Sequence, residues 1–291
     1  MAGCPIFRIM GVSLVMIAAT HGHGIAQSVA DPKLEEAKKA FAAARNDVER
    51  ADALLRMGGE QMLVLDNLAA AQSSFQKCVD MLRPSSRTSA QSQLYLVKCL
   101  GELGLVRNLQ HNTKDALSIR QEQVSIARRM LPALRDPSEW QDLLLSSLED
   151  LTLTYFDLGD NRAASSSASD AVQTAREIAA QRPDSGRAQY RLTETLGLQG
   201  KAMVLLSDSA GAEKCFNENL QILEPLAAAN PNWFEANYDY IQMLIWKGEN
   251  SRDTTFFQKA LDLALAMQRS GILPGQDYNL IANLKKRLNQ K

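Results

Sequence analysis

Apolar side chains recur along this chain with a period of 48 residues. A large apolar residue keeps one place in four successive copies, and an alanine keeps a second place sixteen residues later. These positions are Leu100, Leu148, Leu196 and Leu244, followed by Ala116, Ala164, Ala212 and Ala260. An upstream copy, offset by 45 residues, contains Leu55, Gly59 and Ala71. One register kept through five copies predicts a protein built from repeats.

Each copy has the pattern of two helices that pack closely. A small residue follows the repeated leucine by four positions, as Gly200 follows Leu196, and residues four apart lie on one face of a helix. We therefore expect a second helix, which contains Ala212, to cross the first helix at Gly200. Turn residues punctuate the ends of the pairs, at Pro84, Pro137, Pro183 and Pro231. The pattern predicts an all-α solenoid of antiparallel helix pairs.

The repeats account for nearly all of the chain after its first residues. We expect a helical repeat domain over residues 33–291, with about five helix pairs and a C-terminal capping helix. Residues 27–32 form a short linker before it. The basic cluster Lys285-Lys286-Arg287 falls near the end of the last helix, where cations are favourable.

Residues 1–26 have the features of a cleavable signal peptide. Arg8 is the only charge before Asp31, and an apolar run of 11 residues extends over 9–19. That run is about half the length of a membrane-spanning helix, and the small residues Gly24 and Ala26 precede a cleavage position. We therefore expect export to the periplasm or the medium, with no membrane span in the mature chain.

Composition restricts the classes of partner. Hydrophobic residues make up 45% of the chain and charged residues 22%, which is typical of a folded protein. With 32 basic and 33 acidic side chains the net charge is -1, and no basic run follows one face. Nucleic acid is therefore not an expected partner.

Three cysteines, Cys78, Cys99 and Cys215, remain after removal of the signal peptide. An odd number in an exported protein leaves at least one free thiol or an intermolecular bridge. A disulfide between Cys78 and Cys99 requires their Cα atoms to lie within about 7 Å. Three small buried side chains are the alternative.

No catalytic, cofactor-binding or metal-binding residues are expected. The chain has no glycine-rich phosphate loop, no Cys-x-x-Cys pair and no His-Glu-x-x-His motif. His111 is the one histidine outside the predicted signal peptide, and it falls in a predicted turn. A nucleophile with a histidine base would have to use it, and nothing places a serine or cysteine beside it.

An aromatic cluster, Trp233, Phe234, Tyr238, Tyr240 and Trp246, precedes the last repeat's end. Core packing and capping is the favoured interpretation, and an exposed contact patch stays open.

These residues resemble the tetratricopeptide repeat (TPR) family. Its pattern of a large residue, a small residue, a turn and then alanines is matched by Leu148, Thr152, Gly159, Ala164 and Ala171. The family repeat is about 34 residues long, so a 48-residue repeat is similar to long-helix bacterial variants. The resemblance implies a right-handed superhelix in which the first helix of each pair lines a concave, partner-binding groove.

The resemblance also nominates groove positions for a protein or peptide partner. They are Lys98, Asn108, Glu149, Phe156, Glu194, Lys201 and Gln242. The function expected is a non-enzymatic interaction scaffold of the bacterial cell envelope. The alternatives are the helical domain of a cell-envelope enzyme and a self-assembling structural solenoid; the oligomeric state stays open.

Overall fold

The computed structural model describes residues 31–85, 89–133 and 136–289. The predicted signal peptide (1–26) and most of the predicted linker lie outside these residues. The chain divides into two compact units. Their described parts are 31–167, here the N-terminal unit, and 168–289, here the C-terminal unit. In the described residues every regular element is helical, as the repeat pattern predicts.

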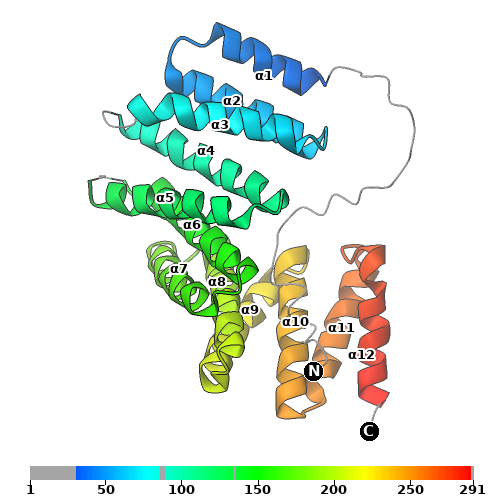
Figure 1. Ribbon diagram of the computed structural model, residues 1–291. Helices are drawn as coiled ribbons and strands as arrows, with labels where there is room; N and C mark the ends of the chain where they lie inside the picture. Colours follow the sequence, from blue (N-terminus) through cyan, green and yellow to red (C-terminus); the bar gives the residue numbers. More distant parts are fainter. Residues whose placement is uncertain (1–30, 86–88, 134–135, 290–291) are drawn as a thin grey trace. The chain divides into compact units, whose positions relative to one another are not determined.

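The N-terminal unit is a stack of antiparallel helices (Figure 1). Its elements are α1 (Pro32–Ala43), α2 (Asp47–Leu63), α3 (Leu68–Ser85), α4 (Ala90–Leu109), α5 (Thr113–Met130), the 3-10 turn η2 (Leu131–Ala133), α6 (Ser138–Asp157) and the beginning of α7 (Asn161–Gln181). From α1 to α6 each helix packs against the next, and α2 also contacts α4, which contacts α6. The first helices of successive pairs therefore lie beside one another.

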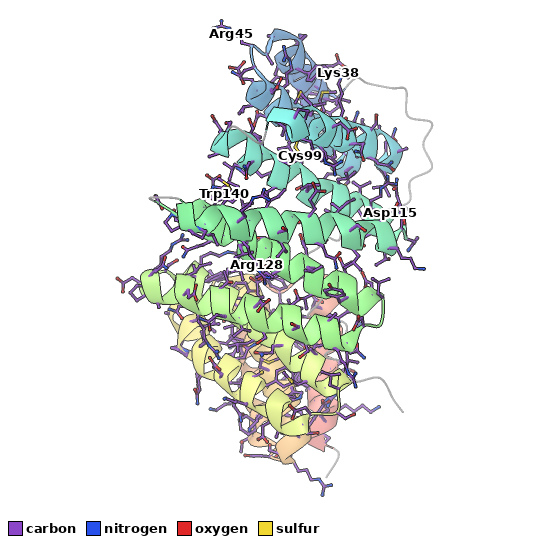
Figure 2. The ribbon with its side chains drawn as sticks, turned by 60° about the vertical axis from the view of Figure 1, so that its left-hand side comes forward. Lys38, Arg45, Cys99, Asp115, Arg128 and Trp140 are labelled. Atoms are coloured by element: carbon purple, nitrogen blue, oxygen red, sulfur yellow. A yellow bond between two sulfur atoms is a disulfide. The ribbon has the colours of Figure 1, made fainter. Side chains whose placement is uncertain are left out.

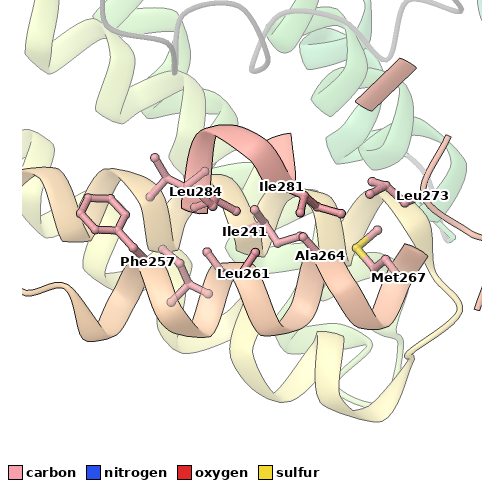
Figure 3. Packing of buried hydrophobic residues seen from close by; sticks show 11 residues of the cluster. Ile241, Phe257, Leu261, Ala264, Met267, Leu273, Ile281 and Leu284 are labelled. Atoms are coloured by element: carbon pink, nitrogen blue, oxygen red, sulfur yellow. The ribbon is translucent and has the colours of Figure 1, made fainter. Parts of the chain in front are cut away.

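The C-terminal unit continues the same construction. After the rest of α7 it contains α8 (Gly186–Leu205), α9 (Ser209–Ala229), α10 (Phe234–Ser251), α11 (Thr255–Arg269), the 3-10 turn η3 (Gly275–Asp277) and α12 (Tyr278–Asn289). From α8 to α12 each helix packs against its successor. Figure 3 shows Phe257, Leu261 and Ala264 along α11 with Ile281 and Leu284 of α12 gathered over them. The burial of Ile281 and Leu284 places α12 as the last layer of this core.

The repeated positions form the core, which confirms the 48-residue register. The four leucines of the period and the four alanines sixteen residues later are all at most 2% exposed. Gly200 lies where two helices cross, as expected, because a Cβ added there would overlap the Phe216 ring of α9. The small residue therefore makes room for a large one from the second helix.

The first copy is shifted by one residue from its predicted register. Gly58, rather than Gly59, lies against the Phe75 ring of α3, while a Cβ on Gly59 would meet no heavy atom within 4 Å. Leu54 is 1% exposed and so takes the place that was assigned to Leu55. The prediction for Leu55 and Gly59 was wrong because two adjacent glycines fit the pattern equally well.

Each turn inside a pair ends its first helix with a residue of positive φ. These residues are Asp66, His111, Gly159, Ser207 and Arg252. They follow one another at steps of 45, 48, 48 and 45 residues, so they occupy one structural position. Glycine is the usual residue in this left-handed conformation, and it occurs in one turn of the five. His111 is exposed here, as predicted for a turn residue.

A disulfide joins Cys78 of α3 to Cys99 of α4, with 6.1 Å between their Cα atoms. Both residues are fully buried, and the thiol of Cys215 is free and buried. Cys99 lies within the helical stack of the N-terminal unit (Figure 2). Because α3 ends one helix pair and α4 begins the next, the bond links neighbouring repeats.

Candidate partner-binding site

Two of the nominated groove residues join α4 to α6. The Lys98 ammonium pairs with the Glu139 carboxylate at 2.9 Å, and it lies 5.3 Å from the centre of the Tyr95 ring. The Asn108 amide donates a hydrogen bond to the Thr154 hydroxyl at 3.2 Å. These side chains are half-buried, so their polar groups stabilise the contact between two first helices.

The other nominated residues are half-buried or buried, so much of each side chain contacts the rest of the chain. Glu149 and Phe156 of α6 and Lys201 of α8 are half-buried and interact within the chain. Gln242 of α10 is 6% exposed, which leaves little of its side chain for a partner. Glu194 of α8 is half-buried and lies 3.5 Å from Arg191. Burial raises the pKa of Glu194 despite the nearby guanidinium groups of Arg191 and Arg187.

A charged cluster in the N-terminal unit is centred on the buried side chain of Arg120. This residue of α5 follows Gly104 by sixteen positions, as Phe216 follows Gly200. A Cβ on Gly104 would lie 2.8 Å from Arg120 Nε, so the guanidinium occupies the space that a phenyl ring fills in the other unit. Arg120 is 2% exposed.

Arg120 reaches two carboxylates of the first helices. Its Nη1 lies 2.8 Å from Oδ2 of Asp150 on α6 and donates a hydrogen bond to Gln123 at 3.1 Å. Glu102 of α4 is close enough to interact electrostatically with both Arg120 and Asp150. Burial raises the pKa of Glu102, and Arg120 opposes that shift. The Arg120 guanidinium thus interacts with two carboxylates, those of Asp150 and Glu102.

A second cluster joins α8 to α10 in the C-terminal unit, and it is built from carboxylates and a tyrosine hydroxyl. The Tyr190 hydroxyl donates a 2.8 Å hydrogen bond to Oδ2 of Asp239. Burial raises the pKa of Asp239 to about 7, with Glu194 and Glu235 adding to the rise and the Tyr190 hydrogen bond opposing it. Asp239 forms no ion pair among the residues the structure describes, and the groups that shift its pKa are Tyr190, Glu194 and Glu235.

Aromatic rings flank this second cluster. The Tyr190 ring packs against Trp233 at the start of α10, with 5.0 Å between the ring centres and 49° between their planes. The guanidinium of Arg187 lies 5.6 Å from the centre of the Tyr190 ring. Trp233 is half-buried whereas Trp246 is buried, so the aromatic cluster of the sequence divides between a core role and the edge of the site.

Sequence inspection missed Arg120, Asp150, Tyr190 and Asp239. The first has a signal in the sequence, since an arginine stands where the repeat register has Phe216. Tyr190 and Asp239 are 49 residues apart, one more than the period, so they belong to almost the same place in successive repeats. This spacing predicts that the two residues lie near each other. A tyrosine and a carboxylate form no sequence motif, however, that would single out this contact.

The two clusters of described residues contain no arrangement of metal ligands. In the described part of the chain no group of three histidine, cysteine or carboxylate side chains is placed to hold a metal ion. Every helix there is too short or too polar to cross a bilayer. The Tyr190–Asp239 cluster offers hydrogen-bond acceptors and aromatic faces, which favour cations over anions.

No protein-family model and no curated protein matches the sequence. Solved structures do match its fold. The apo form of RapI is 13% identical, with a TM-score of 0.58 over 88% of this chain and 69% of that one. A signal-transduction ATPase with a tetratricopeptide repeat sensor from Pyrococcus horikoshii is 12% identical, with a TM-score of 0.54 over 87% and 38%. Aspartyl phosphate phosphatase F from Bacillus subtilis is 12% identical, with a TM-score of 0.52 over 89% and 65%.

These similarities establish the architecture. The chain has the fold of tetratricopeptide-type helical repeats, as the resemblance implied, with helices longer than the family's usual repeat requires. At this level of identity the likeness extends to the fold alone, and function depends on the chain's own side chains.

Proposed function

We propose that the chain is an exported, non-enzymatic scaffold of the bacterial cell envelope that binds a partner protein through the first helices of its repeats. The distribution of polar groups supports this proposal. Half-buried ionisable side chains gather on the first helices, as Glu102 does on α4 and Asp239 on α10. The second helices instead bury small residues, such as Ala164 and Ala212. The polar faces are therefore the ones suited to specific recognition.

Two observations favour export. The N-terminal sequence has a short apolar run after a single arginine and ends in small residues before Gln27. The Cys78–Cys99 disulfide is a bond that persists in oxidising compartments and is rare where thiols are kept reduced.

Crosslinking in the native cells tests both parts of the proposal. A C-terminally tagged full-length protein is crosslinked, purified from separated cell fractions and analysed by mass spectrometry, together with whatever is bound to it. We expect a mature N-terminus at Gln27, an envelope fraction, and one partner enriched over an unrelated exported bait. An intact Met1 in the cytoplasmic fraction would exclude export, and a bait recovered without an enriched partner would exclude stable binding.

A further inference from the structure

The contact between α8 and α10 has an excess of acidic groups. Tyr190 and Glu194 are four residues apart on α8, and Glu235 and Asp239 are four residues apart on α10. Each pair therefore projects from one side of its helix. The Tyr190–Asp239 hydrogen bond brings these two sides together. We call the surface formed by these four residues the α8/α10 acidic site.

One carboxylate oxygen in this site has no partner. Asp239 Oδ2 accepts from Tyr190, but Oδ1 meets no donor among the residues that the structure describes. Oδ1 is not an enclosed atom, since it is absent from the buried polar atoms that lack a hydrogen bond. A half-buried carboxylate with one free, accessible oxygen is a favourable acceptor for a charged donor from outside the chain.

The charges around the site leave room for one more cation. Three carboxylates, those of Glu194, Glu235 and Asp239, are accompanied by the guanidinium groups of Arg187 and Arg191. Among these five groups the carboxylates outnumber the guanidinium groups by one when Asp239 is ionised. Arg191 lies 3.5 Å from Glu194, whereas Asp239 forms no ion pair among the described residues.

An aromatic ring beside the site suits an organic cation. The Tyr190 ring is 3% exposed and is covered by the Arg187 guanidinium and by Trp233, so it is not itself available to a partner. The half-buried Trp233 ring offers the apolar surface next to the carboxylates. A lysine or arginine side chain has an aliphatic stem for such a surface and a charged end for the carboxylate. No described group of three ligands is placed to hold a metal ion instead.

We propose that the α8/α10 acidic site binds a lysine or arginine side chain of the partner protein, with Asp239 as its principal acceptor. The proposal rests on the proposed function, because it names the chemistry of the partner. Glu235, which is exposed at the edge, adds attraction at longer range. Tyr190 is a positioning residue, since its hydroxyl holds Asp239 in place.

Random peptides displayed on phage provide a defined probe. A library of 12-residue peptides is selected on the full-length protein, and the enriched peptides are synthesised with a fluorescent label. Each peptide is also made with its lysine or arginine replaced by glutamine. Affinities are measured by fluorescence anisotropy for the parent protein, Asp239→Asn and the control Asp184→Asn. The control removes one exposed carboxylate from the turn before α8.

We expect the enriched peptides to share a basic residue. Asp239→Asn is expected to weaken their binding by about tenfold or more, as loss of one partner of a desolvated charge pair does. The glutamine peptides are expected to bind the parent and Asp239→Asn equally, and Asp184→Asn is expected to behave as the parent. Glu235→Gln, which changes an exposed side chain, gives a second test and a loss of about threefold.

The acidity of Asp239 gives an independent readout. With the pKa of Asp239 at about 7, the affinity for basic peptides should rise between pH 6 and pH 8 as this carboxylate ionises. The rise should vanish in Asp239→Asn. If the affinity of the parent does not rise between pH 6 and pH 8, the assignment of Asp239 as the acceptor would be contradicted.

The outcomes separate the two proposals. Enriched peptides without a basic residue, or an equal loss of affinity for the basic and glutamine peptides, would overturn the inference and leave partner binding intact. A library that yields no binding peptide would overturn both. If Asp239→Asn fails to fold by circular dichroism, Glu235→Gln decides, and an unchanged affinity there overturns the inference.

Discussion

Each unit holds a half-buried carboxylate at the contact between first helices, and the groups around that carboxylate differ between the units. In the N-terminal unit Arg120 crosses from α5 to reach Asp150 and the neighbourhood of Glu102. In the C-terminal unit the repeat positions of Arg120 and Asp150 hold Phe216 and Trp246, whose ring centres lie 4.5 Å apart. The acidic group Asp239 occupies another place in the repeat, where it accepts from a tyrosine hydroxyl and has no ion pair among the described residues. The first unit thus pairs its carboxylate within the chain, and we infer that the second leaves its carboxylate for a partner.

The difference separates a stabilising cluster from a recognition cluster. A buried cation that pairs with a carboxylate of its own chain has little left to offer a ligand, and its loss is costly. A buried carboxylate without a counter-ion costs folding free energy at neutral pH, and a bound cation returns it. Two experiments test this contrast directly, and two more compare how the two units are held together.

Removal of Arg120 should have the largest effect. Arg120→Ala removes the guanidinium that pairs with Asp150 and opposes the rise in the pKa of Glu102, and it empties the space beside Gly104. We expect the free energy of unfolding of the full chain to fall by about 3–5 kcal/mol, because a large buried side chain and a charge-assisted hydrogen bond are lost together. Urea denaturation followed by circular dichroism measures it, with the exposed Arg162→Ala as control. Equal midpoints for the two variants would remove the stabilising role of Arg120.

Acidification should strengthen the C-terminal unit. The pKa of Asp239 is about 7 in the folded chain and about 3.9 when unfolded, so the folded state holds this proton more tightly. The resulting stability is fully present below about pH 4 and is lost as pH rises through about 7. We expect this carboxylate to contribute on the order of 2–4 kcal/mol.

Thermal and urea unfolding of the parent and of Asp239→Asn between pH 5 and pH 8 isolate the contribution of Asp239. The stability difference between the two proteins should change with pH in the stated direction. Parallel curves would mean that Asp239 titrates as an ordinary exposed carboxylate.

Reduction of the disulfide should destabilise the N-terminal unit. Cys78 and Cys99 are 21 residues apart, and a loop of that size corresponds to about 3 kcal/mol in the chain-entropy description. We expect Cys78→Ala with Cys99→Ala to lower the free energy of unfolding by this amount. Dithiothreitol should have no further effect on the variant, and Cys215→Ala serves as control for loss of a buried thiol.

Two adjacent glycines of α2 should respond in opposite directions. Gly58→Ala pushes a methyl group into the Phe75 ring, and we expect a loss of about 1–3 kcal/mol. Gly59→Ala meets no neighbour and should stabilise the helix by about 0.5–1 kcal/mol. Gly200→Ala in the C-terminal unit should behave as Gly58→Ala does. Melting temperatures of the three variants check the register. A lower melting temperature for Gly59→Ala would favour the alignment that places Leu55 and Gly59 in the repeat positions.

The helical architecture could be predicted because burial leaves a period in the sequence. Leu196 and Ala212 had to be apolar and small in every copy, since the same helix crossing is built each time. Positions that depend on backbone conformation left a weaker signal. The positive-φ residue of the turns is glycine at Gly159 but arginine at Arg252, so composition alone does not reveal it.

The clusters were harder to predict than the scaffold. The groove positions were assigned by helix offset, and offset alone placed Gln242 toward a partner although it is buried. Whether a polar side chain faces a partner or a neighbouring helix depends on its contacts in three dimensions. Lys98 illustrates this, because its ammonium group is taken up by Glu139, a residue 41 positions away. The sequence could not decide whether Cys78 and Cys99 form a disulfide for the same reason, since the Cα separation across a turn depends on how α3 and α4 pack.

The disulfide has a mechanical consequence. A chain pulled from its two ends lengthens as its helices unravel, by about 3.6 Å for each residue released. The 21 residue steps between Cys78 and Cys99 are bypassed by the bond, so about 75 Å of contour stays hidden under load while the sulfurs are joined. An oxidised scaffold of this kind transmits tension across the boundary between its first two repeats through a covalent bond, whereas every later boundary in the described chain relies on side-chain packing, hydrogen bonds and ion pairs.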